Sequence, residues 1–419
     1  MNFSDGKTEL SGQKADIKKF IVDTALLLIL LLAGNTVIYH FGNTVFPVGD
    51  RVELTLGLSE RNGGAFLDAD DISTLENNTG NTGIAAYSAE LPGTAGYEGK
   101  YGQVRMMASN EHVLDYYPYK LVKGSFLTRH HCRKGSRVAV IGKNLAARLF
   151  MSCDVIGYGI YINGSLYRIA GVYEEIITPV TLFSLDNAER VFVPLTSIDE
   201  YSGIPISNIF MKDDGGEGYD LDYFAGHMGE KYYSKLARYN IKDYTRSTEF
   251  ISQFMKFDFF IIGLSFIILF LRFLILIIKE FSIKMKEFLT DCYLPELLKK
   301  HKRVVFLYVI KIASVAAGIL FIYSMVRFTP FLPERYVPED NLFDLGFYLD
   351  KFTEYIRSEN NPDFPDSIYN ICWETSLTYV LLLSFIALLQ WIKVFRRILG
   401  FVKNKTFSGV KATVKVPRS

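Results

Sequence analysis

The side chains best suited to metal chemistry are grouped at His130-His131-Cys132, in the polar middle of the chain. Imidazole nitrogens and thiolates bind Zn²⁺, but paired ligands in zinc sites are separated by roughly two to five intervening residues. Adjacent side chains rarely converge on one ion, and no other His or Cys group in the sequence has ligand spacing. We therefore expect no metal site.

The sequence also lacks the motifs that bind nucleotides or build a hydrolytic site. It has no Gly-x-x-x-x-Gly-Lys-Ser/Thr loop to hold ATP phosphates and no Gly-x-Ser-x-Gly turn. Gly157, Gly159, Gly164 and Gly171 flank a predicted hairpin, whereas a dinucleotide fingerprint follows a strand and opens a helix. These are more simply turn glycines, so we expect neither catalytic residues nor a bound cofactor.

Any function must instead be positioned by four apolar segments, each close to the roughly 20 residues that cross a bilayer as a helix. The first could be a cleaved signal peptide. However, it is longer than a signal core, and Tyr39-His40-Phe41-Gly42 is a poor cleavage site, so we interpret it as a retained anchor. The predicted order is a cytoplasmic segment 1–20, a first transmembrane helix 21–41, an extracytoplasmic domain 42–256, a second helix 257–278, a cytoplasmic loop 279–303, a third helix 304–326, an extracytoplasmic acidic loop 327–374, a fourth helix 375–394 and a basic cytoplasmic tail 395–419.

The distribution of basic residues predicts which side of the membrane each loop occupies. Residues 279–303 contain seven Lys or Arg, and the chain from Lys393 onward contains eight with no acid. Residues 328–374 contain three Lys or Arg against ten Asp or Glu. Because Lys and Arg are enriched in cytoplasmic loops, we expect both termini and the 279–303 loop in the cytoplasm. The net charge of +1 gives no basic field for nucleic acid, and the basic tail fits contact with anionic inner-leaflet lipid.

Three charged residues fall inside the apolar segments, namely Asp23, Arg272 and Lys311. A charge within the membrane costs about 2.5–3.5 kcal/mol on insertion scales. Arg272 and Lys311 lie toward the cytoplasmic ends of their segments, so their side chains can snorkel to the interface. An ion pair between Asp23 and one of these two residues is the alternative.

Residues 42–256 mix strand and helix patterns and predict an α+β domain. The clearest signal is Asn163-Gly164 between two alternating apolar runs, since a type I′ hairpin turn needs positive φ at both central residues. Strands are expected at Val52–Leu58, Arg137–Ile141, Tyr158–Ile162, Ser165–Val172, Val191–Pro194 and Ile206–Met211, and helices at Asp70–Glu76, Lys143–Phe150 and Ser247–Lys256, the last running into the second transmembrane helix. Cys132 and Cys153 can form one disulfide here or remain free thiols.

Residues 121–175 carry an ordered series of glycines and apolar positions. The series comprises Gly124 and Phe126; Val138, Val140 and Gly142; Ala146, Leu149 and Phe150; Ile156-Gly157, Ile160, Ile162 and Gly164; and Ile169-Ala170-Gly171-Val172, followed later by Val191-Phe192-Val193-Pro194. In order and spacing it resembles the extracytoplasmic domain of MacB-type (FtsX-like) ABC transporter permeases. The resemblance implies an α-helical membrane protein with four transmembrane helices and an α+β extracytoplasmic domain inserted between helices 1 and 2. It also implies a non-catalytic subunit whose partners are a separate ABC-type ATPase and a second permease copy.

In that family, a short coupling region after the second membrane helix contacts the ATPase and opens with Arg/Lys-Glu-apolar-Gly. Lys279, Glu280 and Phe281 match this motif and Ile283 follows it, so the resemblance implies these four residues as the ATPase-coupling site. Ser282 replaces the motif glycine, and Lys311 stands where the family has an acidic residue. These departures leave open a permease with altered coupling.

The predicted function is therefore transmission of ATP-driven motion to the extracytoplasmic domain, for export, extrusion or signalling. A membrane-anchored sensor or adhesion protein without an ATPase is the alternative. The altered coupling motif favours it slightly, but three closely spaced membrane helices after the domain are more than an anchor requires. A membrane enzyme would have to use the acidic 328–374 loop, but Leu342–Ile356 is more simply an amphipathic interfacial helix. Neither the ligand nor the choice between homodimer and heterodimer follows from the sequence.

Overall fold

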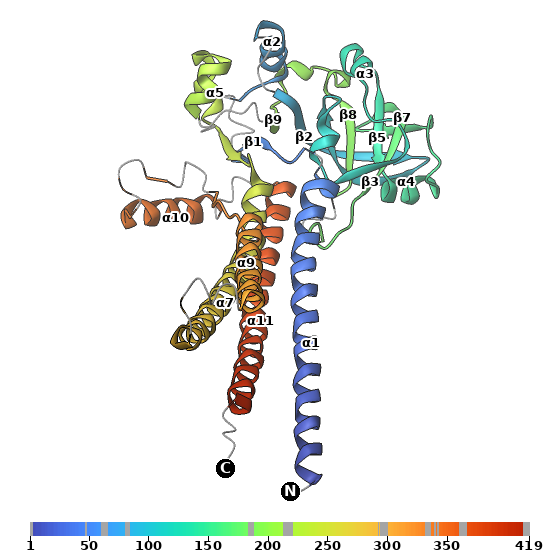
Figure 1. Cartoon of the computed structure of the whole chain (residues 1–419). Helices are drawn as coiled ribbons and strands as arrows, with labels where there is room; N and C mark the ends of the chain where they lie inside the picture. Colours follow the sequence, from blue (N-terminus) through green and yellow to red (C-terminus); the bar gives the residue numbers. More distant parts are fainter. Residues whose placement is uncertain are drawn as a thin grey trace. The chain divides into compact units, whose positions relative to one another are not determined.

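The computed structural model describes residues 3–46, 48–59, 66–79, 84–182, 188–212, 221–291, 293, 301–331, 337–338, 341, 343–359 and 367–413 (Figure 1). The chain divides into two compact units, which are described separately. One comprises Met1–Asn35, Ser252–Phe331 and Val380–Ser419, and the other Thr36–Ile251 and Leu332–Tyr379.

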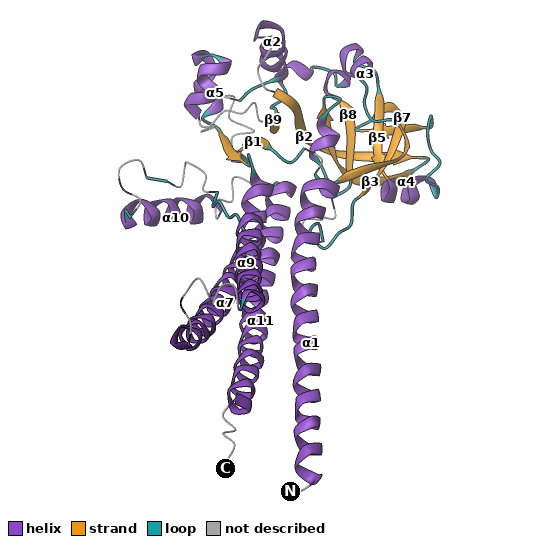
Figure 2. Ribbon diagram, in the orientation of Figure 1, coloured by secondary structure: helices purple, strands orange, loops and turns teal. Residues whose placement is uncertain are grey.

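The first unit is built from long helices (Figure 2), although residues 36–39, 247–251 and 368–379 of these helices belong to the second unit. These are α1 (Phe3–Tyr39), α7 (Ser247–Asp291), α9 (Lys302–Met325) and α11 (Ile368–Thr413). Four helical stretches are long and apolar enough to cross a membrane, namely Asp16–Val45, Ser247–Leu289, Lys302–Met325 and Ile368–Val402. The first of them includes a π-helical turn, His40–Val45, that directly follows α1. Four membrane helices, with an α+β domain after the first, agree with the predicted fold class.

The helices of the first unit meet through close approaches and interhelical polar contacts. Gly263 of α7 lies where a Cβ would be 2.2 Å from a methyl group of Val326, in keeping with the small residues that let membrane helices approach. Asp23 pairs with Arg397 of α11 at 2.8 Å. The alternative pairing of Asp23 with Arg272 or Lys311 is therefore wrong. Sequence separation hid the true partner, because α11 lies at the far end of the chain.

The second unit contains a ten-stranded sheet, with strand order β10-β1-β9-β2-β3-β8-β5-β7-β4 and β6 pairing with both β2 and β7. The strands are β1 (Arg51–Leu56), β2 (Ile84–Tyr97), β3 (Lys100–Ser109), β4 (Tyr119–Gly124), β5 (Val138–Gly142), β6 (Gly159–Ile162), β7 (Ser165–Glu175), β8 (Arg190–Pro194), β9 (Asn208–Lys212) and β10 (Tyr239–Asp243). Because β6 bridges β2 and β7, the strands β2-β3-β8-β5-β7-β6 form a closed ring. The strands β9, β1 and β10 extend from it.

Short helices accompany the sheet. They are α2 (Ala69–Thr79), α3 (Arg129–Lys134), α4 (Lys143–Phe150), α5 (Leu221–Met228) and α6 (Tyr233–Leu236), with α10 (Leu345–Glu359) in the later part of the unit. α2 and α4 confirm the helices predicted at Asp70–Glu76 and Lys143–Phe150. α10 covers most of the predicted amphipathic segment Leu342–Ile356, of which Leu342 lies outside the described residues.

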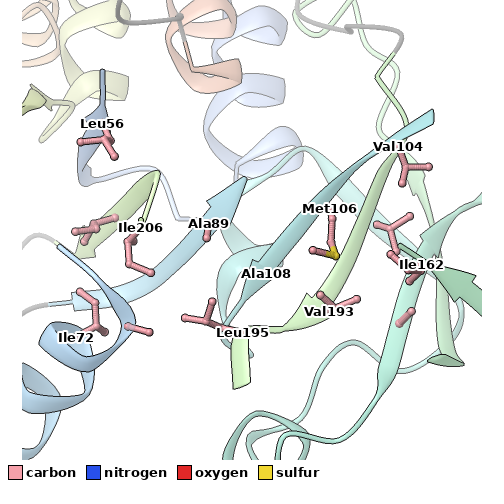
Figure 3. Packing of buried hydrophobic residues seen from close by; sticks show 14 of the residues in the cluster. Leu56, Ile72, Ala89, Val104, Met106, Ala108, Ile162, Val193, Leu195 and Ile206 are labelled. Carbon is pink, nitrogen blue, oxygen red and sulfur yellow. The ribbon is translucent and has the colours of Figure 1, made fainter. Parts of the chain in front are cut away.

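Both faces of the central strands are buried. Figure 3 shows side chains of the larger of two apolar clusters, among them Val193 and Leu195. Alternate side chains of a strand point to opposite faces. Accordingly Val191 and Val193 of β8 join the larger apolar cluster, whereas Phe192 between them joins the smaller one. A strand covered on both sides reads as a continuous apolar run, which is why Val191–Pro194 was recognisable in the sequence.

The predicted hairpin is present as expected. Asn163 has φ +47° and Gly164 has φ +83°, and the register brings Ile162 opposite Ser165. The left-handed backbone at both turn positions explains why Asn-Gly was needed there. Cys132 and Cys153 are both free thiols, which resolves the two possibilities left by the sequence.

Candidate functional site

The four predicted coupling residues lie on the cytoplasm-directed half of α7 as the topology prediction orients it. Lys279, Glu280, Phe281 and Ile283 are all helical, since α7 continues to Asp291, so the first part of the 279–303 segment is a helix. Lys279, Glu280 and Ile283 are exposed, and Phe281 is half-buried. The structure thus brings these residues together on one helical turn and turns Phe281 toward a neighbouring helix.

The neighbouring helix is α9, and Phe281 faces its Tyr308, a side chain that is 5% exposed. Its hydroxyl donates a 2.6 Å hydrogen bond to Oε1 of Glu280. Its ring lies 5.4 Å, centroid to centroid, from the ring of Phe281. Two consecutive coupling residues are therefore held by a single side chain of the next membrane helix.

Two lysines complete this group, which we call the Tyr308 cluster (Glu280, Phe281, Lys284, Tyr308 and Lys311). The Lys284 ammonium lies 5.3 Å and the Lys311 ammonium 5.2 Å from the centroid of the Tyr308 ring. Lys284 is also 3.6 Å from Glu280, the i,i+4 arrangement that favours a helix when the acid comes first. Lys311, which departs from the family pattern, therefore has a defined position against an aromatic face.

A second group, which no motif in the sequence indicated, lies in the other unit. We call it the Tyr369 cluster (Phe46, Arg51, Glu53, Ser247 and Tyr369). Its centre is Arg51, the first residue of β1, which is fully buried. The guanidinium carbon lies 3.7 Å from the centroid of the Tyr369 ring and 4.8 Å from that of Phe46. Nε of Arg51 lies 3.2 Å from the Glu53 carboxylate. A buried charge is thus held by one ion pair and by aromatic faces.

Hydrogen bonds from Tyr369 extend the cluster to other elements. The Tyr369 hydroxyl donates to the carbonyl oxygen of Gly49 at 2.8 Å and lies 2.7 Å from Oγ of Ser247, which begins α7. Next to it, the Tyr244 hydroxyl donates to Oδ1 of Asn370 at 2.8 Å. The first turn of α11 is therefore bonded to the start of α7 and to the segment before β1.

Arg51 also contacts Tyr116, which lies between β3 and β4. Nη1 of Arg51 donates to the Tyr116 carbonyl oxygen at 2.9 Å, and its guanidinium carbon is 5.4 Å from the centroid of that ring. Burial raises the pKa of the Tyr116 hydroxyl to about 12, and the positive charge of Arg51 opposes the rise. The phenol is therefore neutral at physiological pH and serves as a packing surface.

No signal in the sequence could have paired Arg51 with Tyr369. Gly49 and Tyr369 are 320 positions apart, and an arginine at the start of an alternating run reads as a solvated strand end. Only the fold brings these elements together.

The His130-His131-Cys132 group has a local role in the structure. Thr128 precedes α3, and its Oγ1 accepts a 3.3 Å hydrogen bond from the His131 amide, while His131 Nδ1 accepts from the Thr128 amide. This reciprocal arrangement is a capping box. Within the described ranges, no three His, Cys, Asp or Glu side chains are placed to hold a metal ion together.

Comparison with known proteins decides the family of the domain. Residues 24–218 match the family model of the MacB-like periplasmic core domain. The chain carries a MacB-like periplasmic core domain. This confirms the resemblance to MacB-type ABC transporter permeases that the glycine and apolar series between residues 121 and 175 indicated.

Solved structures of similar proteins include two such domains. The chain is similar to the periplasmic region of MacB from Actinobacillus actinomycetemcomitans, with 16% identity, coverage of 47% of this chain and 90% of the other, and a TM-score of 0.36. It is also similar to the extracellular domain of the noncanonic ABC-type transporter YknZ from Gram-positive bacteria, with 16% identity, coverage of 46% and 100%, and a TM-score of 0.34. Scores this low add nothing to the family match. No curated protein matches the sequence.

Proposed function

We propose that this chain is the permease subunit of a MacB-like ABC transporter and passes ATP-driven motion from a separate cytoplasmic ATPase to its MacB-like domain. The observation that carries the proposal is the attachment of Glu280 and Phe281 to Tyr308, in a chain that also contains a MacB-like domain. The work would serve export, extrusion or signalling. ATP would be hydrolysed by the partner and not by this chain.

The ATPase would act on the exposed side of the turn of α7 that carries Lys279, Glu280, Phe281 and Ile283, which we call the coupling turn. Ile283 is a large apolar side chain that is 52% exposed among basic neighbours such as Lys284 and Lys286. Apolar anchors surrounded by charge are typical of protein interfaces. We therefore assign Lys279, Glu280 and Ile283 to the contact surface. Phe281 would pass a push on this turn to α9 through the Tyr308 ring.

The motion would be transmitted to the MacB-like domain along α7. This helix runs without interruption over 45 residues, which at 1.5 Å per residue is about 68 Å. It begins at Ser247, four residues after β10 ends at Asp243. A helix with no break between the coupling turn and the sheet can transmit a displacement along its axis.

The remaining elements fit the same arrangement. With basic segments on the inner side, both termini and the 279–303 segment would be cytoplasmic, and the basic tail would contact anionic inner-leaflet lipid. A second permease copy, identical or related, would face this one, so that two MacB-like domains open and close a space outside the membrane.

The test is gentle extraction of the tagged full-length chain from its native membrane, followed by identification of what is retained with it. We expect a stoichiometric ABC-type ATPase, lost when Glu280, Phe281 and Ile283 are all changed to Ala. The matched control changes Leu264, Ile268 and Leu271 to Ala together, three exposed residues of α7 outside the 279–303 segment, and should leave the ATPase bound.

A preparation without an ATPase, under conditions that hold a known permease complex together, would contradict the proposal. It would favour a membrane-anchored sensor or adhesion protein instead. Retention of the ATPase by the triple variant would place the contact elsewhere and overturn the assignment of the coupling residues.

A further inference from the structure

We propose that the Tyr369 cluster makes α11 a third moving element, by locking its first turn to the start of α7 and to β1. This rests on the proposed function and adds to it, because the order of elements in the chain connects only α1 and α7 directly to the MacB-like domain. α11 has no such connection, since it follows α9 and α10 in the chain. Its attachment comes from side chains.

The lock involves three parts of the unit. Tyr369 lies on the first turn of α11, is 1% exposed and covers the Arg51 guanidinium at 3.7 Å. Its hydroxyl joins Gly49 before β1 and Ser247 at the start of α7. The side chain thus holds the two helix starts and the strand in one place.

A second row of contacts repeats the connection one turn further along. The ring of Trp373 on α11 stacks on that of Phe250 on α7, with centroids 6.2 Å apart and an interplanar angle of 27°. The ring of Tyr244 lies 4.7 Å from that of Tyr369 and 6.4 Å from that of Trp373. Two successive turns of α11 therefore pack against the first turns of α7 and the residues before it.

The buried charge makes the arrangement specific. Within the described residues, Nη2 of Arg51 has no hydrogen-bond partner, so the Tyr369 ring supplies much of what replaces its hydration. An aromatic face attracts a cation more strongly when the cation is shielded from water than when it is exposed to water. If Tyr369 moved away, Arg51 would be left buried with only Glu53, Phe46 and Tyr116. We infer that β1 and the first turn of α11 stay together during movement.

The first test is hydrogen exchange of the full-length protein in nanodiscs without nucleotide. For Tyr369→Leu, which removes both ring and hydroxyl, we expect amide exchange in residues 368–376 and 247–251 to be roughly tenfold faster. For Tyr369→Phe, which keeps the ring over Arg51, we expect a smaller increase. Unchanged exchange in the β2–β3 hairpin would show that the domain remains folded.

The matched control is Tyr239→Phe. Tyr239 is also buried, at 6% exposed, and its hydroxyl donates to the Ile206 carbonyl oxygen at 2.7 Å without contacting α11. This variant loses a comparable hydrogen bond, so exchange in residues 368–376 should not change. Equal exchange at these residues in wild type and Tyr369→Leu, or equal acceleration in Tyr239→Phe, would overturn the lock.

The second test separates this inference from the proposed function. The protein is purified with its retained ATPase, and exchange is compared with and without Mg-ATP and orthovanadate. In the wild type we expect exchange to change in both 279–289 and 368–376; in Tyr369→Leu only the first change should remain. No change in the wild-type segment 279–289 contradicts the proposed function. An intact response of 368–376 in Tyr369→Leu contradicts only the role of Tyr369.

Discussion

The Tyr308 hydroxyl donates a 2.6 Å hydrogen bond to the Glu280 carboxylate, joining α9 to the coupling turn of α7. The donor is buried, whereas 57% of the Glu280 side chain is exposed. A carboxylate that solvent can reach is therefore kept in one orientation by a fixed phenol. The turn of α7 that carries the proposed coupling residues is therefore fixed to α9 by a side-chain contact.

Tyr308→Phe should loosen the coupling turn while keeping the ring that packs against Phe281. A hydrogen bond to a charged group contributes about 1.5–3 kcal/mol, and the exposure of Glu280 reduces this to about 1 kcal/mol. We expect amide exchange in 279–289 to be roughly fivefold faster and less ATPase to be retained on purification. Tyr323→Phe, an exposed change on the same helix, is the control. The same result for both variants would show that the hydroxyl is unimportant.

Gly171→Ala should destabilise the MacB-like domain. A Cβ at Gly171 would lie 2.3 Å from the Ser125 carbonyl oxygen, a backbone atom that cannot rotate away. Forced overpacking of this kind costs about 1–3 kcal/mol, which should appear as a lower Tm of the full-length protein. Gly226→Ala, in the open surroundings of α5, should be neutral or stabilise by up to about 1 kcal/mol. An unchanged Tm for Gly171→Ala would be inconsistent with this packing.

Glu174 should contribute to stability in a pH-dependent way. Hydrogen bonds from Lys143 and then Lys120 hold the pKa of its carboxyl below the usual 4.5. A depressed folded pKa means that the contribution is present above the unfolded pKa and is lost as pH falls through the folded value. The stability difference between wild type and Glu174→Gln should therefore be largest near pH 7 and shrink below about pH 4.5.

Denaturant unfolding at several pH values measures this difference for Glu174. The carboxylate is partly exposed, at 32%, so the effect should be small and should weaken in about 1 M salt. A difference that grows as the pH falls would have the opposite sign and would contradict the assignment.

Ser384→Ala should weaken the contact between α7 and α11. Oγ of Ser384 donates a 2.8 Å hydrogen bond to Oδ1 of Asp258, a fully buried residue whose other carboxyl oxygen has no hydrogen-bond partner among the described residues. Interhelical hydrogen bonds in membranes are worth about 1 kcal/mol, so detergent-solubilised protein should unfold at a lower temperature. Ser324→Ala, which loses only a bond to its own helix, should have little effect. Equal shifts would argue against the interhelical bond.

Elements with a strong local signal could be predicted from the sequence. The β6–β7 hairpin followed from Asn163-Gly164, and α4 from the spacing of its apolar residues. The β2–β3 hairpin was missed because Pro92-Gly93 in the middle of β2 reads as a turn. A proline is tolerated inside β2 because the Pro92 carbonyl oxygen accepts a hydrogen bond from Asn163 rather than from β3. Residue 92 therefore points its backbone polar groups away from the β3 ladder, and its missing amide hydrogen costs no bond there.

The two clusters differ in how far the sequence could reveal them. The proposed coupling residues could be predicted because Lys279-Glu280-Phe281 is a contiguous motif. Their anchor, Tyr308, was not found, since one tyrosine in an apolar helix has no distinguishing pattern. The Tyr369 cluster depends on residues from three distant parts of the sequence, around Arg51, Ser247 and Tyr369. Pairing over such separations is set by the tertiary fold alone.

One edge of β2 pairs with two different strands. Its residues Ile84–Ser88 pair with β9, and Ala95 and Gly96 pair with β6, all on the side opposite β3. Among the described strands, the ladder from β10 and β1 therefore joins the closed ring only along a five-residue stretch. The ring and the three-stranded extension are thus joined by backbone hydrogen bonds along one short stretch of β2. Shear between the extension and the ring is therefore resisted by these few backbone hydrogen bonds together with side-chain contacts such as that of Arg51 with Tyr116.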